Sequence, residues 1–282
     1  MRFASPPFAF VVAAFLAAGA HAEDVQPSRN AGPYVPSPQS VVADMLKVAG
    51  VGPDDFVIDL GSGDGRIVLT AAKVFGARGF GVEIKDELVR LSNESAKREG
   101  LADRVKFVKQ DLFKTDISQA TVLTMYLLPD TVNMLKDKLL AELRPGTRII
   151  SHDYPLTGWI PDDFLKMDLQ DKIAISGVTT TLIYLYVVPA KVQGNWTAKM
   201  PPAMSRQPAT LRLKQQLTRI DGSLVLEGKE IPLEEAKLRG DRLSFRLAGR
   251  KGDFTGQVKG RSIEGTIDNG VSRAPWSAAL GS

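Results

Sequence analysis

The stretch VIDLGSGDGRI, residues 57–67, places three glycines within five positions directly behind an apolar run. The run over residues 55–60 is short, which is typical of a central parallel strand that is buried on both faces. The turn after it lacks the Gly-Lys-Ser/Thr sequence of a Walker phosphate loop. It also lacks the third glycine of a dinucleotide fingerprint, because Arg66 occupies that position. The loop is therefore predicted to hold a ligand that has no pyrophosphate group.

Carboxylates accompany this turn. Asp59 lies near the end of the strand, and Asp64 lies between two of the glycines. Carboxylates repel phosphates but suit a cationic ligand, such as the amino and sulfonium groups of S-adenosylmethionine. Glu83 and Asp111 end the next two predicted strands, where they can accept hydrogen bonds from ribose hydroxyls and from an adenine amino group. Acids at successive strand ends lie along one edge of a parallel sheet, the edge at which open α/β folds bind ligands.

Residues 38–188 alternate between helical and strand-like patterns, which indicates an α/β fold with parallel βαβ units. The last two strand-like runs follow each other without a helix between them, so they predict an antiparallel addition at one edge of the sheet. The predicted helices are 37–50, 66–76, 86–100 and 129–143, and the predicted strands are 55–60, 79–84, 105–111, 121–128, 147–151, 167–175 and 179–188.

The pattern changes after residue 188. Four prolines, at positions 189, 201, 202 and 208, predict a linker over residues 189–208. Short alternating runs follow, separated by Gly-containing turn signals. They predict a small antiparallel all-β domain over residues 209–282, either a sandwich or a barrel, in which we find no catalytic motif. This part carries an excess of basic residues, whereas residues 23–190 carry a slight excess of acids. The basic excess indicates either an acidic partner or an ordinary solvated surface.

The first 22 residues have the pattern of a secretory signal peptide. Arg2 precedes an uncharged apolar stretch over residues 8–20, and Ala20-His21-Ala22 forms a small-x-small cleavage site. We expect cleavage after Ala22 and an exported mature chain, periplasmic or secreted, without stable membrane insertion. A retained anchor is the alternative, although the apolar stretch is short for a membrane span.

The composition excludes several kinds of site. The chain has no cysteine, which excludes a disulfide scaffold, a thiolate zinc site and a cysteine nucleophile. His152 is the one histidine beyond the signal peptide, so no metal site is expected. It is either a general base or a strand-end histidine. His152 cannot form a hydrolase triad with Ser151 and Asp153, because adjacent residues in a strand point to opposite faces.

The glycine loop and the acids at three strand ends, Asp59, Glu83 and Asp111, resemble those of the class I (seven-stranded, Rossmann-like) S-adenosylmethionine-dependent methyltransferases. The resemblance covers residues 33–188. More narrowly, DLGSGDGRIVLTAAK, the upstream PYVPSPQ and the later YLLP resemble the protein-lysine methyltransferases of archaea and mitochondria. The resemblance implies that Glu83 binds the ribose, Asp111 binds the adenine and Tyr34 closes over the cofactor near its transferable methyl group. It also implies a set of residues at the methionine end of the cofactor: Asp59, Gly61, Ser62, Gly63 and Gly65.

The sequence after the fourth strand bears on the methyl acceptor. Methyltransferases of planar amines carry an Asn/Asp-Pro-Pro-aromatic tetrad here, whereas this chain has Tyr126-Leu127-Leu128-Pro129. The absence of an amide or carboxylate in the first position favours an aliphatic amine, such as a protein lysine, and no nucleic-acid acceptor is expected. Tyr34 and Tyr126 are the candidate catalytic residues. Tyr126, Tyr154 and Trp159 are candidate walls of an acceptor channel, although core packing is the default interpretation for each of these three.

Three alternatives remain open from the sequence. One is a methyltransferase with a small-molecule acceptor. Another is an exported, non-catalytic binding protein that keeps the fold, since an exported enzyme has no obvious supply of a cofactor made in the cytosol. The third is a downstream translation start, which would leave the enzyme in the cytosol. Neither the oligomeric state nor the role of the β domain follows from the sequence.

Overall fold

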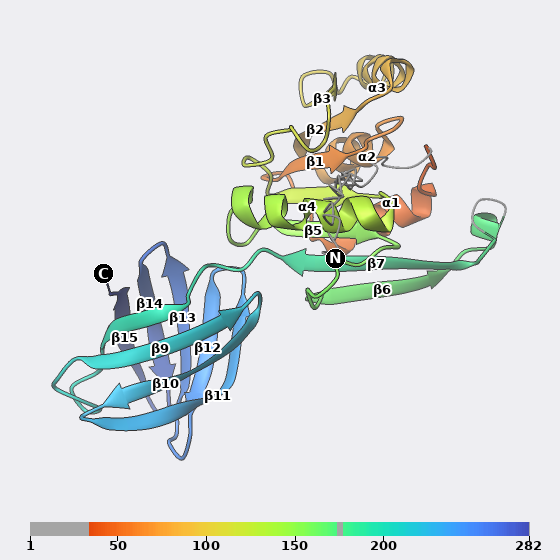
Figure 1. Cartoon of the computed structure of the whole chain (residues 1–282). Helices are drawn as coiled ribbons and strands as arrows, with labels where there is room; N and C mark the ends of the chain where they lie inside the picture. The colour runs from red at the N-terminus through yellow and green to blue at the C-terminus, as the bar shows by residue number, and fades with distance from the viewer. Residues whose placement is uncertain (1–33, 174–176, 282) are drawn as a thin grey trace, which may run out of the picture.

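The computed structural model describes residues 34–173 and 177–281, so the predicted signal peptide lies outside the described residues. Within them the chain forms an α/β domain followed by a closed β-barrel. Figure 1 shows the two domains side by side, with the chain entering the barrel directly after β7. No helix among the described residues combines the length and apolar character needed to cross a membrane.

The α/β domain contains a seven-stranded sheet in the order β3-β2-β1-β4-β5-β7-β6. The strands from β3 to β5 are parallel, while β7 and β6 are antiparallel additions at one edge, which confirms the sequence prediction. The elements in chain order are α1 (Gln39–Val48), β1 (Phe56–Leu60), α2 (Arg66–Phe75), β2 (Arg78–Glu83), α3 (Asp86–Arg98), β3 (Val105–Lys109), β4 (Val122–Met125), α4 (Pro129–Glu142), β5 (Arg148–His152), β6 (Asp163–Asp168), the 3₁₀ helix η1 (Gln170–Lys172) and β7 (Thr180–Val187).

Helices cover both faces of this sheet. Successive residues of a strand point to opposite faces, so Val57 and Ile58 of β1 belong to different core clusters. Val57 packs with the buried residues of α1 and α2, whereas Ile58 packs with those of α4. Both residues are fully buried, as expected for a central strand of an α/β sheet.

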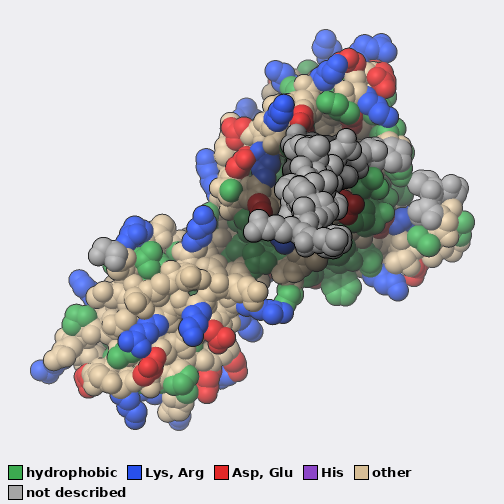
Figure 2. All heavy atoms as spheres, viewed as in Figure 1, with side chains coloured by type: hydrophobic (Ala, Val, Ile, Leu, Met, Phe, Trp, Pro, Cys, Tyr) green, Lys and Arg blue, Asp and Glu red, His purple; other side chains and the backbone are tan. Residues whose placement is uncertain are grey.

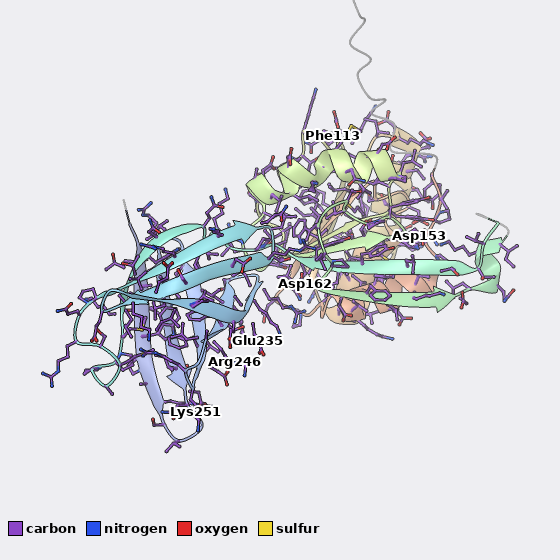
Figure 3. All side chains as sticks on the ribbon, turned by 60° about the horizontal axis from the view of Figure 1, so that its bottom comes forward. Phe113, Asp153, Asp162, Glu235, Arg246 and Lys251 are labelled. Carbon is purple, nitrogen blue, oxygen red and sulfur yellow. The ribbon has the colours of Figure 1, made fainter. Side chains whose placement is uncertain are left out.

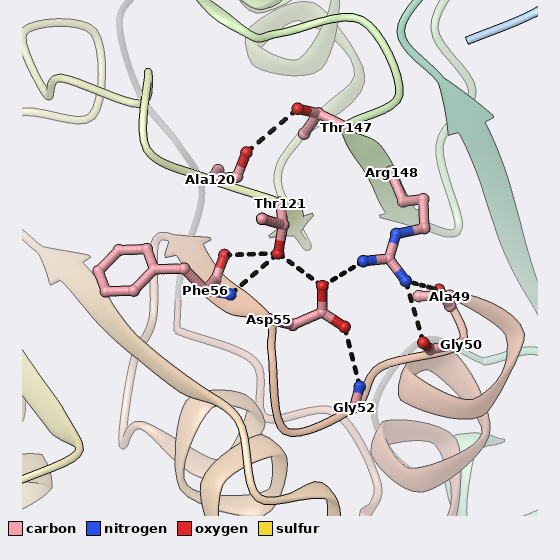
Figure 4. A network of polar contacts seen from close by, with 9 residues as sticks. All are labelled: Ala49, Gly50, Gly52, Asp55, Phe56, Ala120, Thr121, Thr147 and Arg148. Atoms are coloured by element: carbon pink, nitrogen blue, oxygen red, sulfur yellow. Dashed lines mark hydrogen bonds and ion pairs between the residues drawn. The ribbon is translucent and has the colours of Figure 1, made fainter. Parts of the chain in front are cut away.

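A polar network ties the sheet together at the edge where β1, β4 and β5 begin (Figure 4). Asp55 accepts hydrogen bonds from the Gly52 N–H and from the Thr121 hydroxyl, at 2.8 and 2.7 Å, and forms an ion pair with Arg148. Arg148 also donates to the carbonyl oxygens of Ala49 and Gly50, at the end of α1. The network lies at the strands' amino ends and so fixes the frame of the sheet from the side opposite the predicted ligand edge.

The predicted strand over residues 167–175 is wrong in position. The strand that pairs with β7 is β6, Asp163–Asp168, and the chain then turns through η1. β6 is an edge strand with mostly exposed side chains, so it lacks the buried apolar run by which the inner strands are recognised. In Figure 1 the β6–β7 hairpin projects away from the rest of the sheet.

The second domain is an eight-stranded closed barrel, which decides between the two predicted β architectures. Its strands are β8 (Gly194–Lys199), β9 (Ala209–Gln216), β10 (Arg219–Leu226), β11 (Lys229–Arg239), β12 (Arg242–Leu247), β13 (Asp253–Lys259), β14 (Ser262–Asp268) and β15 (Arg273–Leu280). β8 lies inside the predicted linker 189–208, so that boundary is corrected. It belongs to the barrel because it pairs with both β9 and β15, contacts that its short polar sequence does not reveal.

The barrel interior is filled by side chains. Trp196 is fully buried, and Phe245, Phe254 and Trp276 pack against one another with ring centroids 4.7–5.9 Å apart. The barrel meets the α/β domain at the β11–β12 turn, where Arg239 of β11 forms an ion pair with Asp162 at 3.5 Å. Beside it, the N–H of Ala190, which follows β7, donates to the carbonyl oxygen of Gly240 at 2.8 Å. Figure 3 labels Asp162 at this junction.

The surface charges of the barrel are mixed. On the face shown in Figure 2, its Lys and Arg side chains are interspersed with acids. Several described basic residues form ion pairs within the domain, among them Arg212 with Glu230 and Arg246 with Glu235. The basic excess of this part of the sequence therefore does not form a single uninterrupted patch on that face.

Candidate functional site

A cavity of about 360 Å³ opens at the carboxyl edge of the sheet, beside the turn after β1. This volume lies within the usual range for a small-molecule site, roughly 300–1,000 Å³. The structure brings most of the predicted site residues to its wall: Tyr34, Asp59, Gly61, Ser62, Gly63, Glu83, Asp111 and Tyr126. Gly65 does not line the cavity, because it forms the N-cap of α2 with a φ of 82° and faces Phe107 and Ser92.

The turn after β1 is held tightly against the end of β2. The N–H groups of Gly61 and Ser62 both donate to the carbonyl oxygen of Val82 at 2.9 Å, and the N–H of Gly63 donates to Glu83 at 3.1 Å. A β-carbon on Gly63 would lie 2.4 Å from a ring carbon of Tyr34. Only glycine therefore allows the loop and Tyr34 to approach this closely.

Asp59 is a buried carboxyl group beside the cavity, with 2% of its surface exposed. The hydroxyl of Thr124 donates to it at 2.7 Å. Burial raises the pKa of Asp59 to about 7, against the lowering effect of Thr124, and the charges of Glu83 and Asp64 add to the rise. A buried carboxyl group of this kind is poised to become ionised when a cation is placed beside it.

The second acid of the turn has a partner. Arg66 donates to both carboxylate oxygens of Asp64, with its shortest contact at 2.6 Å, and to the carbonyl oxygen of Ser37 at 2.7 Å. Burial acts to raise the pKa of Asp64, but the hydrogen bonds and charge of Arg66 hold it below its ordinary value. Arg66 thus joins Asp64 to the segment before α1 and compensates the charge of Asp64.

Glu83 and Asp111 are oriented by backbone groups. One oxygen of Glu83 accepts the N–H groups of Ile84 and Lys85, at 2.8 and 3.0 Å, and Asp111 accepts the N–H of Phe113 at 2.8 Å. Each carboxylate has further acceptor capacity, since an ionised carboxylate offers about four lone-pair positions. The hydroxyl of Ser62 is buried and has no hydrogen-bond partner among the described residues.

The aromatic residues divide into two groups. Tyr126 lines the cavity, and its ring stacks on His152 with centroids 3.9 Å apart. Trp159 is 3% exposed and packs on Tyr186 in the core, and Tyr154 packs against the same core cluster. Neither residue lines the cavity, so the channel-wall alternative is wrong for both: Trp159 has the default core position, and Tyr154 is partly buried against the same core.

His152 is a buried, neutral residue. It is 1% exposed, burial lowers its pKa to about 4, and its Nδ1 is 2.9 Å from the hydroxyl of Ser37. His152 is therefore a strand-end histidine rather than a general base, and its contact with Ser37 links β5 to the segment before α1. No group of three or more His, Asp or Glu side chains within residues 34–173 and 177–281 is arranged to hold a metal ion.

Sequence reasoning missed two polar residues next to Tyr126. The hydroxyl of Tyr126 donates to Asp153 at 3.2 Å, and Lys172 donates to the same carboxylate at 2.6 and 2.7 Å. Asp153 has a φ of 64°, a left-handed conformation that is uncommon for a residue other than glycine. No local motif marks this pair, because it forms only through the pairing of β5 with β7.

Comparisons with known proteins agree with this geometry. A family model described as the ANTKMT methyltransferase domain matches residues 59–163. The chain is 45% identical over 157 residues to a protein-lysine N-methyltransferase of Saccharolobus islandicus, covering 55% of this chain and 93% of that protein. It is 33% identical over 162 residues to an adenine nucleotide translocase lysine N-methyltransferase of Mus musculus, covering 57% of this chain and 66% of that protein.

A solved structure extends the comparison. An RNA methyltransferase from Salinibacter ruber, in complex with S-adenosyl-L-homocysteine, is 44% identical, with a TM-score of 0.50 and coverage of 56% of this chain and 96% of that chain. The cofactor of this protein is S-adenosylmethionine, and the residues that the family model matches lie in the α/β domain that contains the cavity. The chain therefore belongs to the class I S-adenosylmethionine-dependent methyltransferases, in the family of the protein-lysine N-methyltransferases.

Proposed function

We propose that the protein transfers a methyl group from S-adenosylmethionine to the side-chain amine of lysine in a protein acceptor. The observation that carries this proposal is the 45% identity to a protein-lysine N-methyltransferase over 93% of that relative's length. The cavity adds a physical reason: Tyr126 and Leu127, rather than an amide and proline, line it after β4. An aliphatic amine needs no planar clamp.

The residues at the cavity fit the cofactor. Asp59 and the turn with Gly61, Ser62 and Gly63 would hold the cationic methionine end, with the unpartnered Ser62 hydroxyl available to it. Glu83 would accept from the ribose hydroxyls and Asp111 from the adenine amine. When bound, the cofactor supplies an electrophilic methyl group on a sulfonium. Tyr34, which is 38% exposed beside the loop, would close over the site.

The acceptor nitrogen must be neutral to attack, although a free lysine amine has a pKa of about 10.4. A desolvated position close to a sulfonium charge lowers that pKa, because both effects disfavour the ammonium form. The cavity offers such a position, since the buried side chains of Leu127 and Val82 line it. The protein then chiefly aligns nitrogen, carbon and sulfur for an in-line displacement.

RNA is the second candidate acceptor, because the Salinibacter ruber relative is described as an RNA methyltransferase. The test is to incubate the protein and methyl-labelled cofactor with a protein fraction and an RNA fraction of its own cell. We expect label in protein. Label in RNA alone would refute the lysine proposal. Glu83→Ala should abolish transfer, and the matched control Glu87→Ala, an exposed acid in the first turn of α3, should not.

We also propose that the mature protein is exported, which the pattern of residues 1–22 supports. The next methionine is Met45, inside α1, so a start there would remove Tyr34 and Ser37 from the cavity wall. N-terminal sequencing of the natural protein should find Glu23 first. A natural protein that retains residues 1–22 or begins farther along the chain would contradict export with cleavage.

A further inference from the structure

A buried polar cluster adjoins the cavity behind Tyr126. It consists of Asp153, which follows β5, and Lys172, which ends η1; Figure 3 labels Asp153 beside β7. Lys172 donates to both oxygens of Asp153 and, at 2.7 Å, to the carbonyl oxygen of Thr180. Lys172 is 4% exposed, so this ion pair is shielded from solvent. The carboxylate of Asp153 is thus paired with a buried ammonium group.

Hydrogen bonds hold the backbone of Asp153 as well as its side chain. Its φ of 64° is a conformation that residues with a side chain rarely adopt. Two hydrogen bonds to Leu182 of β7 hold it there: the N–H of Asp153 donates to the carbonyl oxygen of Leu182 at 2.6 Å, and the N–H of Leu182 donates to the Asp153 carboxylate at 3.1 Å. Backbone strain that the surroundings maintain in this way is concentrated at functional sites.

Tyr126 is the point at which the cluster meets the cavity. Its ring plane is set by stacking on the neutral His152, and its hydroxyl donates to Asp153 at 3.2 Å. An ionised carboxylate can only accept hydrogen bonds, and a phenol has a single hydrogen to donate. The hydrogen of Tyr126 is therefore committed to Asp153. The oxygen of Tyr126 can only accept a hydrogen bond from anything that enters the cavity.

Whether the Tyr126 oxygen accepts or donates a hydrogen bond matters for an amine nucleophile. A neutral lysine amine has two N–H bonds and one lone pair, and the lone pair must remain free to attack the methyl carbon. A hydroxyl that donated to the nitrogen would occupy this lone pair, whereas an oxygen that accepts an N–H leaves it free and directs it. A nitrogen held in this orientation can form the N–C bond while the C–S electron pair leaves with sulfur.

We propose that Asp153 is a positioning residue that makes the oxygen of Tyr126 a hydrogen-bond acceptor for the N–H of the incoming lysine amine, with Lys172 holding the Asp153 carboxylate in place through their ion pair. This inference rests on the proposed lysine methylation. Asp153 itself does not contact the acceptor, because Asp153 acts on the acceptor through the hydroxyl of Tyr126.

The test is a double-mutant cycle of Tyr126→Phe and Asp153→Asn, with a lysine-containing acceptor protein that the wild type methylates. In Asp153→Asn the amide can donate to the phenol oxygen, which frees the hydroxyl to bind the amine lone pair. We expect kcat to fall by about tenfold, the effect of one hydrogen bond on a barrier. In the Tyr126→Phe background, the same Asp153→Asn change should have no further effect on kcat.

The proposal is overturned if Asp153→Asn lowers kcat by the same factor in both backgrounds, or leaves kcat unchanged in both. Calorimetric affinity for S-adenosylmethionine should be unaltered in each variant, and a common loss of cofactor binding would show a merely structural role. If Asp153→Asn does not fold, the cycle is run on Asp153→Asn/Lys172→Gln, which leaves no unpaired buried charge.

A second readout does not depend on activity. In protein labelled with ¹³C at the tyrosine Cζ position, the Tyr126 resonance is identified by its absence from Tyr126→Phe and should shift in Asp153→Asn. An unchanged resonance would overturn the proposed hydrogen bond. A wild-type protein that methylates no lysine refutes the proposed function instead, whatever the resonance shows.

Discussion

Asp59 gives the most quantitative prediction, because its ionisation is coupled to the charge of the cofactor. The pKa of the buried carboxyl group is raised from 3.8 to about 7, so most molecules carry a neutral Asp59 below pH 7. A sulfonium and an ammonium group beside it favour the ionised form. Binding the cofactor below pH 7 therefore requires that a proton leaves Asp59.

The magnitude follows from this pKa. At pH 6 the free protein should release about 0.9 proton on binding, and the affinity should fall by about tenfold for each pH unit below 7. Asp59→Asn removes the titration but keeps an acceptor for the Thr124 hydroxyl. The variant should show a flatter pH dependence and, at pH 8, a weaker affinity by about ten- to a hundredfold, the loss of one charged hydrogen bond.

Isothermal titration of S-adenosylmethionine at pH 6, in two buffers of different ionisation enthalpy, measures the released protons. The difference between wild type and Asp59→Asn removes the titration of the nucleoside's own groups. Equal proton release by both proteins would refute the reasoning, because it would show that Asp59 does not respond to the cation.

The raised pKa of Asp59 weakens cofactor binding at low pH, but it stabilises the fold of the cofactor-free protein at low pH. A folded state with a raised carboxyl pKa binds its proton more tightly than the unfolded chain does. The contribution of Asp59 to stability is therefore present at about pH 4 and is lost as the pH rises to 7. The loss is up to about 4 kcal/mol, an order-of-magnitude figure for a three-unit shift. In chemical denaturation, the free energy of unfolding of Asp59→Asn relative to wild type should rise as the pH goes from 4 to 7, whereas a constant difference would contradict the assignment.

The other predictions concern the loop, the histidine and the frame of the sheet. Gly63→Ala should weaken cofactor binding with a modest stability loss, because the positive φ of 53° disfavours alanine and its methyl group meets the Tyr34 ring. Gly65→Ala has the same kind of backbone cost at a φ of 82° and also clashes with Phe107 and Ser92, so it should lose several kcal/mol. Equal thermal shifts for the two variants would contradict this. The contribution of His152 to stability should be lost as the pH falls from 6.5 through 4, because the imidazole must charge in a buried site, and this effect is opposite in sign to that of Asp59. In denaturation curves, His152→Gln should therefore gain stability relative to wild type as the pH falls. Asp55→Ala should lower the unfolding free energy by about 3 kcal/mol while calorimetry finds the cofactor affinity unchanged.

Local patterns were sufficient to predict the inner part of the molecule. The apolar run before Gly61, the glycine spacing and the acids at strand ends are short-range signals, so the parallel sheet and most of the cavity wall follow from them. Gly65 was assigned to the cavity by its place in the motif. It instead caps α2, because a helix start with positive φ and no room for a side chain also requires glycine.

Features that depend on pairing between distant segments could not be predicted in this way. Lys172 meets Asp153 only because β7 returns antiparallel to β5, and β8 belongs to the barrel only because β15 closes it. The apolar character of Trp159 is compatible with a channel wall and with a core position, and its packing on Tyr186 decides between them.

The position of the transferred methyl group distinguishes lysine methylation from the other acceptor chemistries. Peptide mass spectrometry of acceptor proteins, after incubation with the enzyme and a cofactor carrying a ¹³CD₃ methyl group, locates that group to a single residue. We expect labelled methyl groups on lysine side-chain nitrogen, and we expect them to be lost in Glu83→Ala. Label found on another residue type, or only on nucleotides, would show that lysine is not the acceptor.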